Sequence, residues 1–177
     1  HLGTLWQDPY ESINIANNFI SELEGKKVGF SETLKNRYIA EAKFIRAYFY
    51  YNLIQYFGDV PLITTPSKGG DDFFVKRKPA SEVWGFVTTE LKWCIQNLPY
   101  KSEYSGEDIA RANKGAAKIL LAKTYMVQEN WSEAEVLVDE IIASGEYALE
   151  QDITDNWDIS NEHGIESIFE KDYGSGF

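Results

Sequence analysis

The stretch AEAKFIRAYFYYNLIQYFGDVPLI, residues 40–63, is the strongest indication of the fold in this chain. Six of the ten residues from Tyr48 to Phe57 are aromatic. On a helix, the apolar residues of this stretch cover most of the circumference, which indicates burial on several sides. Gly58 tolerates the left-handed conformation that ends many helices, and Pro61 cannot continue a helix. The stretch therefore predicts the central helix of an all-α protein.

Start and stop signals predict four further helices. Asp8, Pro9 and Glu11 form a capping-box arrangement with proline at the first helical position. Asn130, with Glu133 three positions later, is expected to cap the last helix. Two other helices are expected to begin at Pro79 and Asn113, and Ser31 is expected to cap the central helix. The predicted helices span 9–24, 32–57, 79–98, 114–127 and 131–144.

Side chains buried on the aromatic helix are expected to contribute strongly to the stability of the fold. Tyr48, Phe49, Leu53 and Phe57 are expected to be largely buried, so Phe49→Ala should cost about 3–5 kcal/mol. Elsewhere, Asn17 is expected to be a partnered polar residue at a helix contact. Cys94, the one cysteine, allows no internal disulfide and is expected to be a small buried hydrophobe. His163 is expected in a solvated loop.

The fourth and fifth helices form a predicted antiparallel hairpin of tetratricopeptide type. Earlier helix pairs repeat less regularly, so we expect an imperfect helical-repeat scaffold with irregular loops and little strand. Residues 64–78 and 100–112 are expected to be exposed loops, and ESIFEKD, residues 166–172, is the one expected strand.

Composition and motifs exclude several functions. The net charge is −11, which argues against a nucleic-acid partner. No phosphate loop, nucleophile elbow or zinc signature is present, so no catalytic residue, cofactor or metal is expected. The spacing of Asp152, Asp155 and Asp158 lacks the glycine and terminal glutamate of a calcium loop.

Exposed tryptophans are the candidate ligand contacts, because sugar rings stack on indoles. The chain has five tryptophans. Trp84, Trp93 and Trp131 lie on predicted helices, where packing is the default. Trp6, ahead of the first predicted helix, and Trp157, in an irregular polar stretch, are the two candidates, although packing remains an alternative for both.

Two blocks resemble a known family: residues 40–63 and RANKGAAKILLAKTYMVQENWSEAEVLVDEIIASGEYAL, with YESINIANNFI and NEHGIESIFEKDY near the ends. Together they resemble the SusD/RagB family of bacterial cell-surface glycan-binding lipoproteins. The resemblance implies a non-catalytic, lipid-anchored outer-membrane protein of Bacteroidota that binds oligosaccharides or polysaccharides. It also implies a SusC-like TonB-dependent transporter as partner.

Family members are two to three times longer, so residues 1–177 are expected to be the N-terminal and central helical part of a SusD-like domain. The lipidated cysteine is absent, and this part alone is expected to bind sugars weakly or not at all. The alternative hypothesis is a tetratricopeptide-type protein-interaction domain without sugar specificity. A third hypothesis, a glycoside hydrolase, is disfavoured because no acid/base pair stands out.

Overall fold

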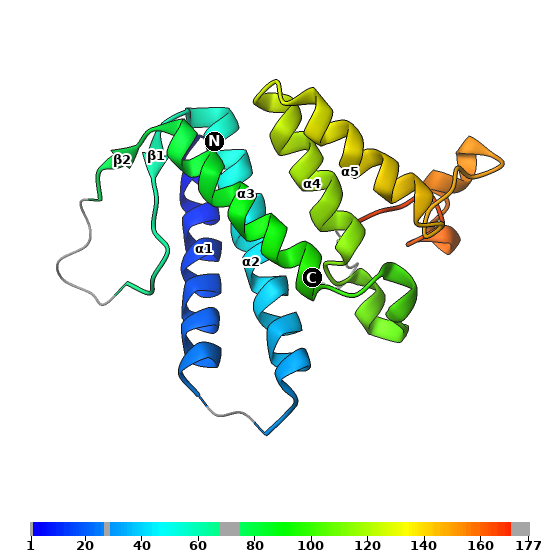
Figure 1. Ribbon diagram of the computed structural model, residues 1–177, viewed down its shortest axis with the longest axis horizontal. Coiled ribbons are helices and arrows are strands. Elements are labelled where there is room, and N and C mark those ends of the chain that lie inside the picture. The colour runs from blue at the N-terminus through cyan, green and yellow to red at the C-terminus, as the bar shows by residue number, and fades with distance from the viewer. Residues whose placement is uncertain (1, 27–28, 68–74, 171–177) are drawn as a thin grey trace. The chain divides into compact units, whose positions relative to one another are not determined.

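Helices dominate the computed structural model, which describes residues 2–26, 29–67 and 75–170 (Figure 1). Over these residues the α-helices are α1 (Leu2–Gly25), α2 (Glu32–Phe57), α3 (Ala80–Asn97), α4 (Lys114–Val127) and α5 (Trp131–Ala143). Short 3₁₀ helices lie at Lys101–Glu103, Gly106–Ala110, Ile153–Trp157 and Ile159–Asn161. The two strands in this part of the chain are β1 (Val60–Pro61) and β2 (Arg77–Lys78), which pair antiparallel. The predicted all-α fold is confirmed.

The chain divides into two compact units, His1–Asn97 and Leu98–Phe177. In the first unit, α1 and α2 run antiparallel, and α2 packs against both α1 and α3 (Figure 1). In the second unit, α4 and α5 form the predicted antiparallel hairpin. The aromatic-rich segment therefore supplies the helix that contacts both of its neighbours in the first unit.

The ends of α2 follow from local chemistry, as predicted. The Ser31 hydroxyl accepts a hydrogen bond from the Leu34 N–H at 3.2 Å, which satisfies one amide of the first turn. Gly58 has a φ of 66°, and its N–H donates to the Ile54 carbonyl at 2.9 Å. A side chain at Gly58 would be strained in this left-handed conformation.

The predicted start of the first helix is wrong. Helix α1 begins at Leu2, and Pro9 lies inside it rather than at its first turn. Proline removes the hydrogen bond to the carbonyl four residues earlier, which is why the sequence favoured a start there. Tertiary contacts hold the extra turn instead, because Trp6 packs edge-on against Phe57 at a centroid distance of 5.0 Å.

Burial along α2 differs from the predicted set. Leu53 is buried as expected, but Tyr48 is 39% exposed, and Phe49 and Phe57 are only partly buried. Tyr50 and Phe44 are instead the large buried rings. With 3.6 residues per turn, two neighbouring helices cover only part of the circumference, and Tyr48 projects outside that part. Composition alone does not reveal which rings lie inside it.

Of the two helix caps predicted in the second unit, one is present. The Asn113 side chain accepts a hydrogen bond from the Ala116 N–H at 2.9 Å, which confirms the start of α4. Helix α5 begins at Trp131 as expected, but the Asn130 side chain makes no capping bond. Its backbone carbonyl accepts from the Ala134 N–H at 3.2 Å, so the predicted capping box with Glu133 is wrong.

The irregular segment after α5 is held by side chains. Lys101 Nζ donates to the carbonyls of Gly164 and Ser167 at 2.7 and 2.6 Å, and Asn113 Nδ2 donates to the Ile168 carbonyl at 2.9 Å. These carbonyls bond to side chains and not to a neighbouring strand. The strand predicted at 166–172 is therefore wrong over 166–170, and positions 171–172 lie outside the described residues.

The two predicted loops contain ordered elements. Residues 77–78 of the first form β2, while 68–74 lie outside the described residues. In the second, the Tyr104 hydroxyl donates to the Ala112 carbonyl at 2.9 Å, and both residues are buried. His163, also expected in a loop, lies in one but is only partly exposed, with Nδ1 3.6 Å from a Glu170 carboxylate oxygen.

Cys94 is buried on α3, as predicted, and its thiol donates to the Ala40 carbonyl at 3.2 Å. Burial raises the pKa of this thiol well above its usual range. Since the thiolate is the nucleophile, we expect an aromatic disulfide reagent at pH 8 to label Cys94 only after denaturant is added. Rapid labelling of the native protein would contradict this burial.

Candidate functional site

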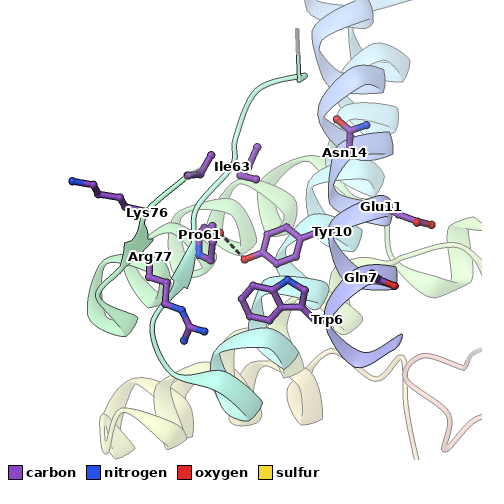
Figure 2. Close-up of a pocket in the computed structure, with 10 residues that line it drawn as sticks. Trp6, Gln7, Tyr10, Glu11, Asn14, Pro61, Ile63, Lys76 and Arg77 are labelled. Atoms are coloured by element: carbon purple, nitrogen blue, oxygen red, sulfur yellow. Dashed lines mark hydrogen bonds between the residues drawn. The ribbon is translucent and has the colours of Figure 1, made fainter. Parts of the chain in front are cut away.

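A groove of about 1000 Å³ lies between α1 and the strand region of the first unit (Figure 2). The wall formed by α1 consists of Trp6, Gln7, Tyr10, Glu11 and Asn14. The wall formed by the strand region consists of Pro61, Ile63, Val75, Lys76 and Arg77. A second cavity of about 430 Å³ shares Tyr10, Asn14, Ile63 and Val75 with the first. The two cavities together define the candidate groove.

Helical spacing explains the α1 wall. Trp6 and Tyr10 are four residues apart, so their rings lie on one face of the helix, and both point toward the strand wall (Figure 2). Gln7 and Glu11, on the adjacent line of the helix, point away from that wall. The groove therefore has an aromatic side next to the strands and a polar rim on α1.

Trp6 is the centre of a cluster of rings. Its indole lies 5.2 Å from the Tyr10 ring and 5.0 Å from the Phe57 ring. The Arg77 guanidinium carbon lies 5.5 Å from the indole centroid, within the range of a cation–π contact. Trp6 remains partly exposed at the groove. Its orientation is thus set by packing while part of its surface is open.

The strand wall is held by side chains from α1 and α2. The Tyr10 hydroxyl donates to the Pro61 carbonyl at 2.8 Å, and the Tyr50 hydroxyl donates to the Ile63 carbonyl at 2.9 Å. Asn17 Nδ2 donates to the carbonyls of Ile63 and Thr65 at 3.0 and 3.2 Å. These bonds satisfy backbone groups that a longer sheet would otherwise pair.

A buried ion pair lies behind this wall. Arg46 is 4% exposed, and its Nε donates to Glu90 Oε2 at 2.9 Å, while Lys43 Nζ donates to Glu90 Oε1 at 2.6 Å. Arg46 also donates to Asn17 Oδ1 at 2.6 Å and to the Thr64 carbonyl at 3.2 Å. The prediction that Asn17 is a partnered polar residue at a helix contact is confirmed.

The two phenols that hold the strand wall, Tyr10 and Tyr50, are neutral donors. Burial raises the pKa of Tyr50 to about 12, and it raises the pKa of Tyr10 further. At neutral pH each hydroxyl therefore keeps the proton that it donates to the strand wall. Ionisation does not weaken these two contacts in the physiological range.

The tryptophans predicted as ligand contacts lie in different units. Trp6 lines the groove, whereas Trp157 is 77% exposed in the second unit and does not line it. Trp84 is buried, but Trp131 is 61% exposed, so the packing expected for Trp131 is wrong. Tyr10 and Arg77 were missed as groove residues. The spacing of Trp6 and Tyr10 was a usable signal, but nothing local marks Arg77.

The acidic residues in the described ranges form no metal site. In residues 2–26, 29–67 and 75–170, no three His, Cys, Asp or Glu side chains are placed to bind a metal. Asp152 and Asp158 instead accept hydrogen bonds at 2.9 Å from the N–H groups of Thr154 and Ser160. None of the helices in the described part of the chain combines the length and apolar character of a membrane span.

Sequence comparison finds a family and several relatives. The sequence model of a SusD-like family, described as "Starch-binding associating with outer membrane", matches residues 1–126. SusD-like protein P25 of Formosa agariphila is 30% identical over 168 residues, which cover 95% of this chain and 31% of that protein. A SusD-like protein of Bacteroides ovatus is 31% identical over 133 residues, 75% of this chain and 23% of its own length.

Solved structures show the same fold. A laminarin-binding SusD-like protein superposes with a TM-score of 0.85 at 31% identity, over 94% of this chain and 36% of that structure. Surface glycan-binding protein A from Bacteroides fluxus superposes with a TM-score of 0.84 at 29% identity, over 95% of this chain and 36% of its own. The chain spans about a third or less of the length of its curated relatives.

Proposed function

This chain belongs to the SusD-like family, and from that premise we propose that the complete protein binds oligosaccharides or polysaccharides at the bacterial cell surface without cleaving them. The observation that carries the proposal is the groove beside Trp6 and Tyr10. Aromatic rings next to planar polar side chains suit a sugar, whose C–H faces pack on rings while its hydroxyls form hydrogen bonds. Gln7, Glu11 and Asn14 provide donors and acceptors for those hydroxyls.

The non-catalytic part of the proposal rests on the carboxylates at the groove. Most glycoside hydrolases use a pair of carboxyl groups on either side of the scissile bond. Among the described residues that line the larger cavity, Glu11 is the one carboxylate, and it points away from the strand wall (Figure 2). This arrangement supports binding and offers no acid/base pair for hydrolysis.

The cellular setting that we propose follows the family. The description of the matching family associates it with the outer membrane. We propose that the complete protein is lipid-anchored on the extracellular face and delivers glycans to a SusC-like TonB-dependent transporter. Cys94 is buried, so an anchor cysteine would have to lie outside residues 1–177. Cross-linking in intact cells followed by identification of the partner would test the delivery step.

Trp6→Ala is expected to weaken glycan binding by the complete protein about 2- to 10-fold. An aromatic contact contributes about 0.5–1.5 kcal/mol beyond area burial, which corresponds to this range. Calorimetry with laminarin and starch oligosaccharides is the measurement. Trp131→Ala is the matched control, because Trp131 is an exposed tryptophan on α5 outside the groove.

Trp157 is the second proposed contact, and it is 77% exposed. Unchanged affinity in Trp6→Ala, together with loss in Trp157→Ala, would move the sugar site to the second unit. Loss of glycan affinity in Trp131→Ala alone would instead place a sugar contact on α5, where Trp131 is 61% exposed. The isolated 177 residues are expected to bind more weakly than the complete protein.

A further inference from the structure

The groove presents hydrogen-bond donors that the protein leaves open. One guanidinium nitrogen of Arg77, Nη1, donates to the Asp59 carbonyl at 3.1 Å. In the described part of the chain, neither Arg77 nor Lys76 pairs with a carboxylate, and the Trp6 indole N–H has no acceptor. Three different donor groups therefore line one region of the groove, which favours a ligand rich in acceptor atoms.

Three acceptors on the strand side of the groove already receive hydrogen bonds from the protein. The Pro61 carbonyl accepts a hydrogen bond from the Tyr10 hydroxyl, and the Ile63 carbonyl accepts from Tyr50 and Asn17. The Asp59 carboxylate accepts from the Ala80 N–H at 2.8 Å, at the start of α3. A ligand at the strand wall therefore meets three open donor groups next to carbonyls that already accept hydrogen bonds. Neutral hydroxyl groups, which both donate and accept, use such a surface less fully than an oxyanion does.

Local charge agrees with this asymmetry. The chain carries a net charge of −11, yet Lys76 and Arg77 lie side by side on the groove. Their neighbour Lys78 differs, because its ammonium lies 3.0 Å from a Glu82 carboxylate oxygen and it does not line the groove. Among the described residues that line the larger cavity, Glu11 is the one acidic side chain, and it points away from the strands (Figure 2).

We propose that the preferred glycan carries an oxyanion, a uronic carboxylate or a sulfate ester, placed beside Arg77 while a sugar ring contacts Trp6. This inference rests on the proposed glycan-binding function and narrows its substrate class. The planar fork of arginine matches the paired oxygens of a carboxylate or sulfate. The cation–π contact with Trp6 holds the guanidinium next to the position of the sugar ring.

Calorimetry on the complete protein tests the proposal with three probes of equal chain length. These are a neutral laminarin oligosaccharide, an oligogalacturonate and a sulfated galactan oligosaccharide. We expect at least one acidic probe to bind about 10-fold more tightly than the neutral probe at low salt, and the difference to shrink as salt screens the charges. Which acidic probe binds more tightly distinguishes carboxylate from sulfate.

Arg77→Gln is expected to weaken acidic binding several-fold more than neutral binding. Lys78→Gln, one position along the same strand, is the matched control and should leave the preference unchanged. Arg77→Lys keeps the charge and should retain part of the preference for acidic probes. Thermal unfolding of each variant shows whether a loss of binding reflects loss of folding.

Two results overturn the inference. Neutral binding that equals or exceeds acidic binding contradicts it while the proposed glycan-binding function stands. An equal loss of neutral and acidic affinity in Arg77→Gln also contradicts it, because Arg77 then has no specific role toward the anion. If the complete protein binds none of the three glycan probes, the result contradicts both the inference and the proposed function.

Discussion

Glu90→Ala is expected to lower the free energy of unfolding of the first unit by about 3–5 kcal/mol. The variant removes the carboxylate that pairs with Arg46 and Lys43, and Arg46 is only 4% exposed. Removing one partner of a buried pair leaves an uncompensated buried charge, which costs more than the pair itself contributes. The loss extends to the groove, because Arg46 also holds Asn17 and the Thr64 carbonyl.

Chemical denaturation followed by circular dichroism measures this effect. Glu22→Ala is the matched control, because Glu22 pairs with Lys26 on the surface of α1 and its side chain is 64% exposed. That control should change stability by no more than about 0.5 kcal/mol. Equal midpoints for the two variants would show that the Arg46–Glu90 pair is hydrated in solution.

Phe44→Ala is expected to cost about 3–5 kcal/mol, provided that the site does not collapse. Phe44 is 2% exposed on α2, so the substitution removes a ring whose surface is almost entirely in contact with protein. Phe49→Ala, on the same helix, is the matched comparison. Because Phe49 is only partly buried, its loss should be clearly smaller than that of Phe44→Ala.

The same denaturation experiment ranks the two phenylalanine variants. A larger loss for Phe49→Ala than for Phe44→Ala would mean that the surface around Phe49 is covered in solution. The comparison also tests the correction to the sequence-based core, in which Phe49 was expected to be buried and Phe44 was not singled out.

The helices could be predicted because their signals are local. Ser31 and Asn113 cap the helices that they precede, and Gly58 ends α2 in a left-handed conformation. Each signal acts within one helical turn, so no knowledge of the rest of the chain is needed. The start of α1 failed as a prediction because Trp6 and Phe57, far apart in the sequence, hold the turns before Pro9.

The family and part of the candidate site were also within reach of the sequence. Residues 40–63 carry most of the resemblance, and the sequence alone indicates Trp6 as a candidate ligand contact. Tyr10 lies one helical turn from Trp6, so a helix running through Pro9 would have indicated it as well. Arg77 had no such signal, since its neighbours Lys76 and Lys78 look equivalent in the sequence.

Local patterns in the sequence thus determined which segments are helical, where most helices end and that the aromatic-rich segment is α2. Which faces of α2 are covered, and where the groove lies, depends on how α1, α2, α3 and the strand region pack together. The physical reason is the range of the interactions. Tyr10 and Asn17 hold carbonyls about 50 positions away, at Pro61 and Ile63, by side-chain hydrogen bonds. Such bonds form only after α1, α2 and the strand region have packed together. The same packing places Arg77 beside Trp6, and no local pattern in the sequence predicts that contact.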